Sequence, residues 1–285
     1  MIKAIATDLD GTLFYPKRKI RLLKSKNRKF LKTLDENNIE IVVVTGRNRS
    51  IAEKIERRIQ SKRKLSMIGC SGSLIIHDGE VIREKPIDKQ KILKLIDEFE
   101  NEKEIKSIIF MGNFKGMLIH LTHFPKIFSP LVLLGLRFQG AYYEKSYIGK
   151  KRVMKMLEDD TSKVFKVMPI FGYSDFGKRG MKKAKEFASR MREKFGSDFE
   201  FFESGTAVEI LVKGTDKAES LKELFSKYNI NDNEVLVVGD SGNDIPMLQQ
   251  FPNSFAMKHA PEYVKKCAKN EIEYVYELEK YLTTK

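Results

Sequence analysis

The sequence predicts an α/β fold, with a Rossmann-like core built on a parallel sheet and an inserted domain of α+β type. At both ends of the chain, short runs rich in β-branched residues alternate with helical segments, which is typical of strand–helix–strand units and a parallel sheet. Between about residues 86 and 205 the pattern changes to helices and paired strands, which indicates an antiparallel sheet with helices. We therefore expect a core formed by residues 1–85 and 206–285, interrupted by an inserted domain over residues 86–205.

Length and composition are those of a globular protein. The 285 residues, 41% of them hydrophobic, are enough to bury a sizeable core. No stretch is apolar over the roughly 20 residues that a membrane helix needs, and no signal-peptide pattern precedes the first predicted strand. We therefore expect no membrane association and a cytoplasmic location. The two cysteines, Cys70 and Cys267, lie far apart, and the four histidines form no convincing ligand set, so neither a disulfide framework nor a zinc site is expected.

The formal net charge of +14 is the one unusual total. Much of the excess falls in basic runs at residues 17–19, 24–32 and 57–64. Such runs usually form a solvated face, and a basic surface also attracts phosphorylated metabolites, so nucleic acid is not expected as the main ligand. A nucleic-acid-binding or regulatory protein that uses this basic surface is kept as an alternative.

The first predicted strand ends at a pair of carboxylates. Residues 2–7 are apolar-rich and partly β-branched, as in a buried strand of a parallel sheet, and Asp8, Asp10 and Gly11 follow directly. Open α/β sheets place their ligand crevice at the carboxyl ends of the strands, and Gly11 lets the backbone turn so that both carboxylates can converge. Acidic oxygens there suit Mg²⁺, and one carboxylate can attack phosphorus while the other transfers protons. The alternative is a plain acidic turn after a strand.

The following strand predicts more polar groups at the same edge of the sheet. A helix that begins at Ser25 leads to a buried strand at residues 39–44, and a right-handed crossover brings Thr45 and Gly46 to the same edge as Asp8. A hydroxyl and free backbone N–H groups at this position can hold a phosphoryl oxygen. For this pair alone, a strand-ending turn without function is an equal alternative.

Further elements are expected along the chain up to residue 212. They are a helix at 50–60, a strand at 65–69, a hairpin of 74–77 and 80–83 around Asp78-Gly79, a helix at 88–100, strands at 105–111, 116–121 and 163–171, a helix at 177–195, and strands at 198–203 and 206–212.

The second core segment carries the remaining candidate residues. Lys217 lies near the start of a predicted helix, where a cation is mildly unfavourable with the helix dipole; this is a weak sign of function, with an ordinary surface lysine as the alternative. A buried strand at residues 234–238 then leads into residues 239–244, Gly-Asp-Ser-Gly-Asn-Asp. The glycines free the turn, and Asp240 and Asp244 bring acidic oxygens to a strand end for the second time. A closing helix is expected at about 274–282.

These motifs, in this order, resemble those of the haloacid dehalogenase-like hydrolases, and most closely the Cof-type phosphatases with a type IIB cap. The resemblance implies that Asp8 is the nucleophile and Asp10 the general acid/base. It implies that Mg²⁺ is bound by Asp8, the carbonyl of Asp10, Asp240 and Asp244. The phosphate-binding groups that it implies are Leu9, Thr45, Gly46, Lys217 and Asn243. Ser71, Ala218 and His259 differ from the residues that relatives commonly carry at these positions.

The predicted function is therefore Mg²⁺-dependent hydrolysis of a small phosphorylated metabolite, of the sugar phosphate or cofactor phosphate type, through an aspartyl-phosphate. A phosphotransferase or mutase of the same superfamily is the alternative within this class. We expect the inserted domain to be a cap that sets substrate choice, and the protein to be a monomer or homodimer.

Overall fold

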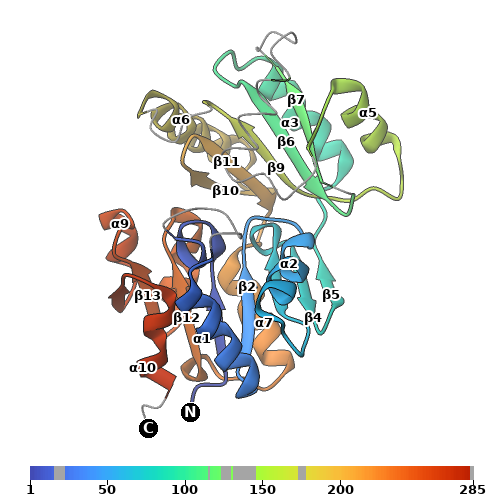
Figure 1. Ribbon diagram of the computed structural model, residues 1–285. Coiled ribbons are helices and arrows are strands. Elements are labelled where there is room, and N and C mark those ends of the chain that lie inside the picture. The colour runs from blue at the N-terminus through green and yellow to red at the C-terminus, as the bar shows by residue number, and fades with distance from the viewer. Residues whose placement is uncertain (16–22, 115, 123–129, 131–145, 173–177, 283–285) are drawn as a thin grey trace. The chain divides into compact units, whose positions relative to one another are not determined.

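The computed structural model describes residues 1–15, 23–114, 116–122, 130, 146–172 and 178–282. The chain divides into two compact units (Figure 1). The core unit comprises Met1–Glu84 and Asp216–Lys285, and the inserted unit comprises Lys85–Thr215. The basic run expected at residues 17–19 lies outside the described residues.

The core unit is built on an eight-stranded sheet of order β14-β13-β12-β1-β2-β3-β4-β5. Its strands are β1 Ala4–Thr7, β2 Glu40–Val44, β3 Ser66–Gly69, β4 Leu74–His77, β5 Glu80–Glu84, β12 Val235–Gly239, β13 Asn253–Met257 and β14 Asn270–Ile272. Its helices are α1 Ser25–Glu36, α2 Ser50–Ile59, α7 Lys217–Lys227, α8 Ile245–Gln250, α9 Glu262–Lys265 and α10 Glu279–Leu282.

Six neighbouring strands of this sheet, from β14 to β3, are parallel to one another. β4 pairs antiparallel with β3, and β5 pairs antiparallel with β4. α1 packs against α2, and α7 packs against α8; Figure 1 shows α1 and α2 in front of the sheet and α7 behind it. Because helices cover both faces, all residues of β1 and β12 are buried, which explains their continuous apolar runs. The predicted parallel pairing of the first two strands is confirmed, with Ala4 opposite Glu40.

The inserted unit is built on a six-stranded sheet of order β10-β11-β9-β6-β7-β8. Its strands are β6 Ser107–Gly112, β7 Met117–Leu121, β8 Ser146–Ile148, β9 Val164–Ile170, β10 Phe199–Ser204 and β11 Ala207–Val212, and its described helices are α3 Lys89–Glu100, α5 Lys150–Glu158 and α6 Lys178–Phe195. All neighbouring pairs are antiparallel except β7 and β8. Apolar residues of all three helices and of the sheet form one hydrophobic core, as expected for an α+β domain.

The structure differs from the sequence prediction in three respects: one domain boundary, the closing helix, and several short elements. The second boundary falls after Thr215 and not after residue 205, because β11 pairs with β9 and β10 and so belongs to the inserted sheet. The closing helix is a 3₁₀ turn over Val275–Leu278 that continues as the short α10. β8, α5, α8, β13, α9 and β14 were not predicted. None of the described helices is both long enough and apolar enough to span a membrane.

Candidate active site

The loop after β1 carries Asp8 to the carboxyl edge of the core sheet. β1 lies between β12 and β2, and the Asp8 N–H donates to the carbonyl of Val238 at 3.0 Å, so the position of Asp8 is fixed by the sheet. The chain then turns through Gly11, whose φ is +94°. A Cβ at Gly11 would lie 2.3 Å from Asp240 Oδ2, so only glycine allows this loop to approach the loop after β12.

Three carboxylates from the two loops meet at this edge. Asp8, Asp240 and Asp244 are all buried, and each offers an oxygen within 4.8 Å of the others'. Asp240 accepts a hydrogen bond from the Thr12 hydroxyl at 2.9 Å. Asp244 Oδ2 accepts from the backbone N–H groups of Asp240 and Ser241, both at 2.9 Å, so this carboxylate also holds its own loop in shape.

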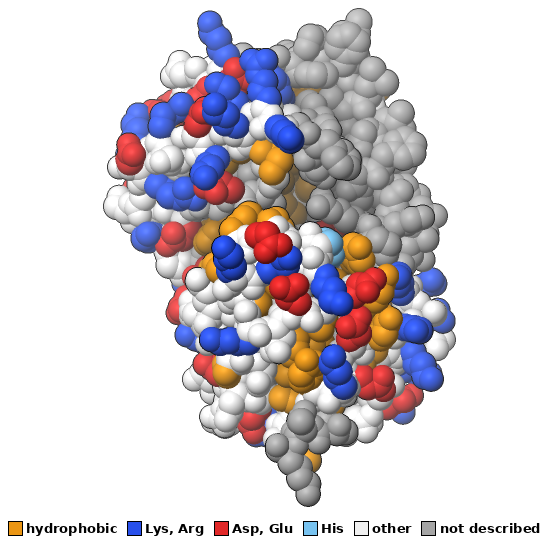
Figure 2. All heavy atoms as spheres, turned by 90° about the vertical axis from the view of Figure 1, so that its left-hand side faces the viewer, with side chains coloured by type: hydrophobic (Ala, Val, Ile, Leu, Met, Phe, Trp, Pro, Cys, Tyr) orange, Lys and Arg blue, Asp and Glu red, His pale blue; other side chains and the backbone are white. Residues whose placement is uncertain are grey.

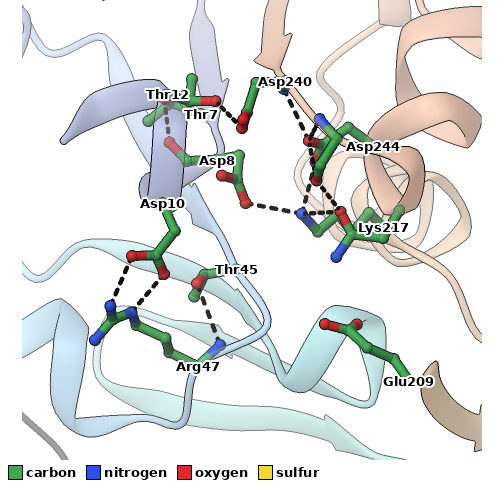
Figure 3. Close-up of polar contacts among 12 residues, drawn as sticks. Thr7, Asp8, Asp10, Thr12, Thr45, Arg47, Glu209, Lys217, Asp240 and Asp244 are labelled. Carbon is green, nitrogen blue, oxygen red and sulfur yellow. Dashed lines mark hydrogen bonds and ion pairs between the residues drawn. The ribbon is translucent and has the colours of Figure 1, made fainter. Parts of the chain in front are cut away.

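Lys217 supplies the positive charge of the cluster. It is the first residue of α7, which Asp216 caps by accepting from the Glu219 N–H. Its Nζ lies 2.8 Å from Asp8 Oδ1 and 2.6 Å from Asp244 Oδ1, and 3.3 Å from Asn243 Oδ1. Figure 3 shows the Lys217 ammonium between the carboxylates of Asp8 and Asp244. The side chain is 1% exposed, so this lysine is not an ordinary surface residue.

The electrostatics of the cluster fit a divalent cation. Burial raises the pKa of Asp8 well above its ordinary value; the Lys217 ammonium opposes this shift, and the carboxylates of Asp244 and Asp240 add to it. Burial acts to lower the pKa of Lys217, but the carboxylates of Asp244 and Asp8 outweigh it and raise that pKa. One ammonium does not neutralise three buried carboxylates. A divalent cation would supply the missing charge, and carboxylate oxygens are the ligands that Mg²⁺ prefers.

Asp10 lies apart from this cluster. Its carboxylate receives two hydrogen bonds from the guanidinium of Arg47, from Nε and from Nη2, both at 2.6 Å. Figure 3 shows the Asp8 carboxylate turned toward Lys217 and the Asp10 carboxylate turned toward Arg47. Of the residues expected at the metal, Asp10 therefore does not contribute its side chain to the group of carboxylates.

The loop after β2 brings Thr45 to the same edge. Thr45 is buried, and its Oγ1 accepts from the Arg47 N–H at 3.2 Å. The next loop is bonded to this one, because the Ser71 N–H donates to the Thr45 carbonyl and the Cys70 N–H donates to the Arg47 carbonyl. Gly46 lies between Thr45 and Arg47 in the chain.

Two of the positions at which this chain differs from its relatives, Ser71 and His259, also lie in the core unit. Ser71 is buried and has a φ of +59°. His259 stacks on Tyr15 with ring centroids 4.0 Å apart, and its Nε2 lies 3.7 Å from Asp240 Oδ2.

The structure thus brings together Asp8, Lys217, Asp240, Asn243 and Asp244 from the predicted residues. Leu9 is buried in the turn after Asp8, where its carbonyl accepts from the Phe14 N–H. Sequence reasoning missed Thr12, which bonds to Asp240, and Arg47, which bonds to Asp10. Both stand within or next to the recognised motifs, and that proximity was the only signal for them.

Comparison with known proteins gives consistent matches. A family model described as haloacid dehalogenase-like hydrolase matches residues 5–278. "Phosphatase YwpJ" of Bacillus subtilis is 28% identical over 279 residues, which cover 94% of this chain and 93% of that protein. "5-amino-6-(5-phospho-D-ribitylamino)uracil phosphatase YbjI" of Escherichia coli is 43% identical over 63 residues, which cover 22% of this chain and 23% of that protein.

Two solved structures show the same fold over nearly the whole chain. SMU.1108c from Streptococcus mutans has a TM-score of 0.81 at 22% identity, with complete coverage of both chains. The subclass IIB sugar phosphatase BT4131 has a TM-score of 0.74 at 18% identity, with 98% of each chain covered.

Proposed function

The chain belongs to the haloacid dehalogenase-like hydrolase family, and we propose that it is a Mg²⁺-dependent phosphatase that forms an aspartyl-phosphate on Asp8. Its proposed substrates are small phosphorylated metabolites, of the sugar phosphate or cofactor phosphate type. The observation that carries the proposal is the buried cluster in which Lys217 contacts Asp8 and Asp244 beside Asp240. The phosphatase names of the relatives support the same reaction class.

Mg²⁺ would be held by Asp8, Asp240 and the backbone carbonyl of Asp10, with Asp244 beside them. When bound, the ion neutralises negative charge on the reacting phosphoryl group and on the carboxylates. Of the three carboxylates, Asp244 accepts the most hydrogen bonds from protein groups, namely from Lys217 and from two backbone N–H groups. Its main role is therefore to hold Lys217 and the loop after β12.

In the first half of the reaction, a carboxylate oxygen of Asp8 attacks phosphorus. A new P–O bond to Asp8 forms while the bond between phosphorus and the leaving oxygen breaks. Asp10 gives a proton to that oxygen, so that the leaving group departs as an alcohol and Asp10 becomes a carboxylate.

In the second half, Asp10 takes a proton from a water molecule whose oxygen attacks phosphorus. The bond between phosphorus and Asp8 breaks, which releases inorganic phosphate and restores the Asp8 carboxylate. Lys217, Asn243, the Thr45 hydroxyl and backbone N–H groups near Leu9 and Gly46 offset the charge on the phosphoryl oxygens in both halves.

The test is a screen of phosphorylated metabolites with the purified protein, in Mg²⁺ and after chelation with EDTA. We expect phosphate release that needs Mg²⁺ and is absent in Asp8→Asn. Phosphate release that is equal after chelation, or undiminished in a folded Asp8→Asn protein, would contradict the proposal.

A pair of variants separates the metal site from the phosphate site. Asp240→Ala should raise the Mg²⁺ concentration needed for half-maximal activity, and Lys217→Ala should chiefly weaken phosphate binding and turnover. The measurement is a grid of initial rates in which Mg²⁺ and substrate are varied independently. Rescue of the Lys217 variant, but not of the Asp240 variant, by added Mg²⁺ would reverse the two roles.

A further inference from the structure

The pairing of Arg47 with Asp10 is a feature of the site that the proposed chemistry has not yet used. Arg47 Nε and Nη2 each donate to a different oxygen of the Asp10 carboxylate at 2.6 Å. Such a two-point contact fixes both the position and the plane of a carboxylate, and it is stronger than a single neutral hydrogen bond.

Arg47 is itself held in place by the neighbouring loops. Its N–H donates to Thr45 Oγ1 at 3.2 Å and its carbonyl accepts from the Cys70 N–H at 2.9 Å. Its side chain is 13% exposed, so the ion pair is not of the exposed and weak kind. The backbone of Arg47 is thus bonded to Thr45 on its own loop and to the loop after β3, and this fixes the point from which the side chain reaches Asp10.

The carboxylates of Asp8 and Asp10 contact two different cationic side chains. Asp8 contacts Lys217, and Asp10, two residues later, contacts Arg47 (Figure 3). The backbone between them supports this division, because Asp10 is extended and Gly11 is left-handed. The Asp10 side chain is 32% exposed, so water reaches the carboxylate while Arg47 holds it.

We propose that Arg47 is the positioning residue that holds the Asp10 carboxylate for activation of water in the second half of the reaction. The inference rests on the proposed function. A guanidinium only donates hydrogen bonds, so it orients Asp10 as an acceptor, which is the role that the attacking water requires. In the first half, Asp10 must turn from Arg47 toward the leaving oxygen in order to give it a proton. A substrate whose leaving group departs without a proton does not need this movement of Asp10.

The alternative role for Arg47 is direct binding of the substrate phosphate. That role would make Arg47 variants bind substrate more weakly, with an increase in KM, and would affect both halves of the reaction. The positioning role predicts a selective fall in the rate at which the phosphoenzyme breaks down.

The experiment follows p-nitrophenyl phosphate by rapid mixing, because nitrophenolate leaves without a proton donor and reports formation of the phosphoenzyme. In Arg47→Ala we expect a burst of about one nitrophenolate per active site, followed by a steady rate that is about 10–100-fold below that of the wild type. Formation of the phosphoenzyme and kcat/KM should change by less than about threefold, and KM should fall together with the steady rate, because breakdown limits the variant. Guanidinium at millimolar concentration should restore breakdown, and sodium chloride of equal ionic strength should not.

Two further variants complete the test. Arg47→Lys keeps the charge but reaches only one carboxylate oxygen, so its breakdown rate should lie between those of Arg47→Ala and the wild type; it also serves if Arg47→Ala does not fold. Arg49→Gln is the matched control, since Arg49 lies two residues later on the same loop and donates to the Gly79 carbonyl at 2.8 Å. Its formation and breakdown rates should equal those of the wild type.

The possible failures are distinguishable. Absence of an acid-trapped phosphoenzyme in the wild type, with every substrate tried, would overturn the proposed function itself. A trapped phosphoenzyme in the wild type, together with equal loss of formation and breakdown in the Arg47 variants or with a rise in KM alone, would overturn only the role of Arg47.

Discussion

Asp8 is placed where its charge is costly to the folded chain and necessary for the proposed chemistry. Its carboxylate is buried beside those of Asp240 and Asp244, and Lys217 offsets only part of this charge. Burial of a charge is unfavourable unless it is paired, so the metal-free protein loses stability at this site. The same arrangement favours a divalent cation, which would remove the repulsion.

Asp8→Asn should therefore remove turnover and stabilise the metal-free protein. Burial raises the pKa of Asp8, so above the unfolded-state pKa of about 3.9 the folded wild type either ionises at a cost or binds a proton that the unfolded chain releases. The variant escapes this cost. We expect its metal-free Tm to exceed that of the wild type by about 2–4 °C at pH 7, or ~1 kcal/mol, and the gain to vanish below about pH 4.

The measurement is differential scanning calorimetry in EDTA and in Mg²⁺, over a series of pH values. Mg²⁺ should raise the Tm of the wild type more than that of Asp8→Asn. Asp10→Asn is the control, because that carboxylate is partly exposed and already paired with Arg47, so it should bring no stabilisation. A lower metal-free Tm in Asp8→Asn than in the wild type would contradict this account of the cluster.

The sequence predicts the members of the acidic cluster better than it predicts their supports. Asp8 and Asp240 each follow a buried apolar run, so strand ends alone bring them to one edge. The contact between Arg47 and Asp10 depends on the conformations of the loops after β1 and β2, and no sequence pattern predicts those conformations. The same is true of the hydrogen bond from Thr12 to Asp240.

Among the elements, long or strongly patterned segments were predictable and short ones were not. β1 and β12 are buried throughout and β2 is buried after Glu40, and α6 repeats apolar residues at helical spacing over 18 residues. β8 and β14 have only three residues each, which is too few to show a period. They are strands because the preceding strand supplies their hydrogen bonds, β7 for β8 and β13 for β14, and this pairing leaves no periodic pattern in the sequence.

The turn after β3 is fitted closely against the start of α7. Gly72 has a φ of +117°, and a Cβ there would lie 2.5 Å from the Asp216 carbonyl oxygen. The Gly72 carbonyl also accepts from the Ser220 hydroxyl at 2.8 Å. This turn therefore supports the first turn of the helix that begins with Lys217.

Gly72→Ala should destabilise the core unit and slow turnover together. The added methyl group strains the backbone and pushes on Asp216, so we expect a loss of about 2–4 kcal/mol in the free energy of unfolding and a lower kcat. Urea denaturation and steady-state kinetics measure the two effects. Gly214→Ala is a suitable control, since Gly214 also has a positive φ, of +67°, but nothing lies within 4 Å of its added Cβ. A loss no greater than that of the control would contradict the contact with Asp216.

Asp35 on α1 holds the segment that leads into β3. It accepts from the Ser61 hydroxyl at 3.0 Å, the Lys62 N–H at 2.9 Å and Arg63 Nε at 3.3 Å. Burial acts to raise the pKa of Asp35, but these hydrogen bonds outweigh it and lower the pKa. A lowered pKa means that the folded state favours the ionised carboxylate.

Asp35→Ala should cost about 2 kcal/mol at pH 7, because it leaves the donors of this segment without their acceptor. The stabilising effect of the ionised carboxylate is present above the unfolded-state pKa and is lost as pH falls through the lowered folded-state pKa. Urea denaturation of wild type and variant at pH 7 and at about pH 3 should show the difference shrinking in acid. A difference that is the same at both pH values would count against the ionic part of this contact.

At the scale of the whole molecule, the formal net charge is +14. Figure 2 shows Lys and Arg side chains interspersed with Asp and Glu over the face that it presents. In the inserted unit, Lys194 pairs with Glu98 and Lys150 pairs with Glu100 at 2.5 and 2.6 Å. Among the described residues, the pattern is that of a solvated basic surface, which also favours the approach of phosphorylated substrates.

The two ends of the interrupted core are joined within the core unit itself. Arg83, next to the end of the first segment, donates to the Ser220 hydroxyl at 2.7 Å and pairs with Glu223 at 2.8 Å. Ser220 and Glu223 belong to α7, which begins just after the second segment resumes at Asp216. A short linker can therefore bridge Glu84 and Asp216, and the residues of the proposed chemistry all lie in the unit that remains.

We expect the core joined by such a linker to fold and to keep some Mg²⁺-dependent hydrolysis of a small activated ester such as p-nitrophenyl phosphate. Discrimination among larger natural phosphates should collapse, because a cap contacts the part of the substrate beyond the phosphate and excludes water from the site. Circular dichroism and thermal unfolding establish that the shortened protein is folded, and kcat/KM over a substrate panel gives the ranking. The Asp8→Asn form of the shortened protein is the control for residual chemistry. A folded core that keeps the full-length ranking would show that the inserted unit does not set specificity, and a structural or dimerisation role for that unit would then be favoured.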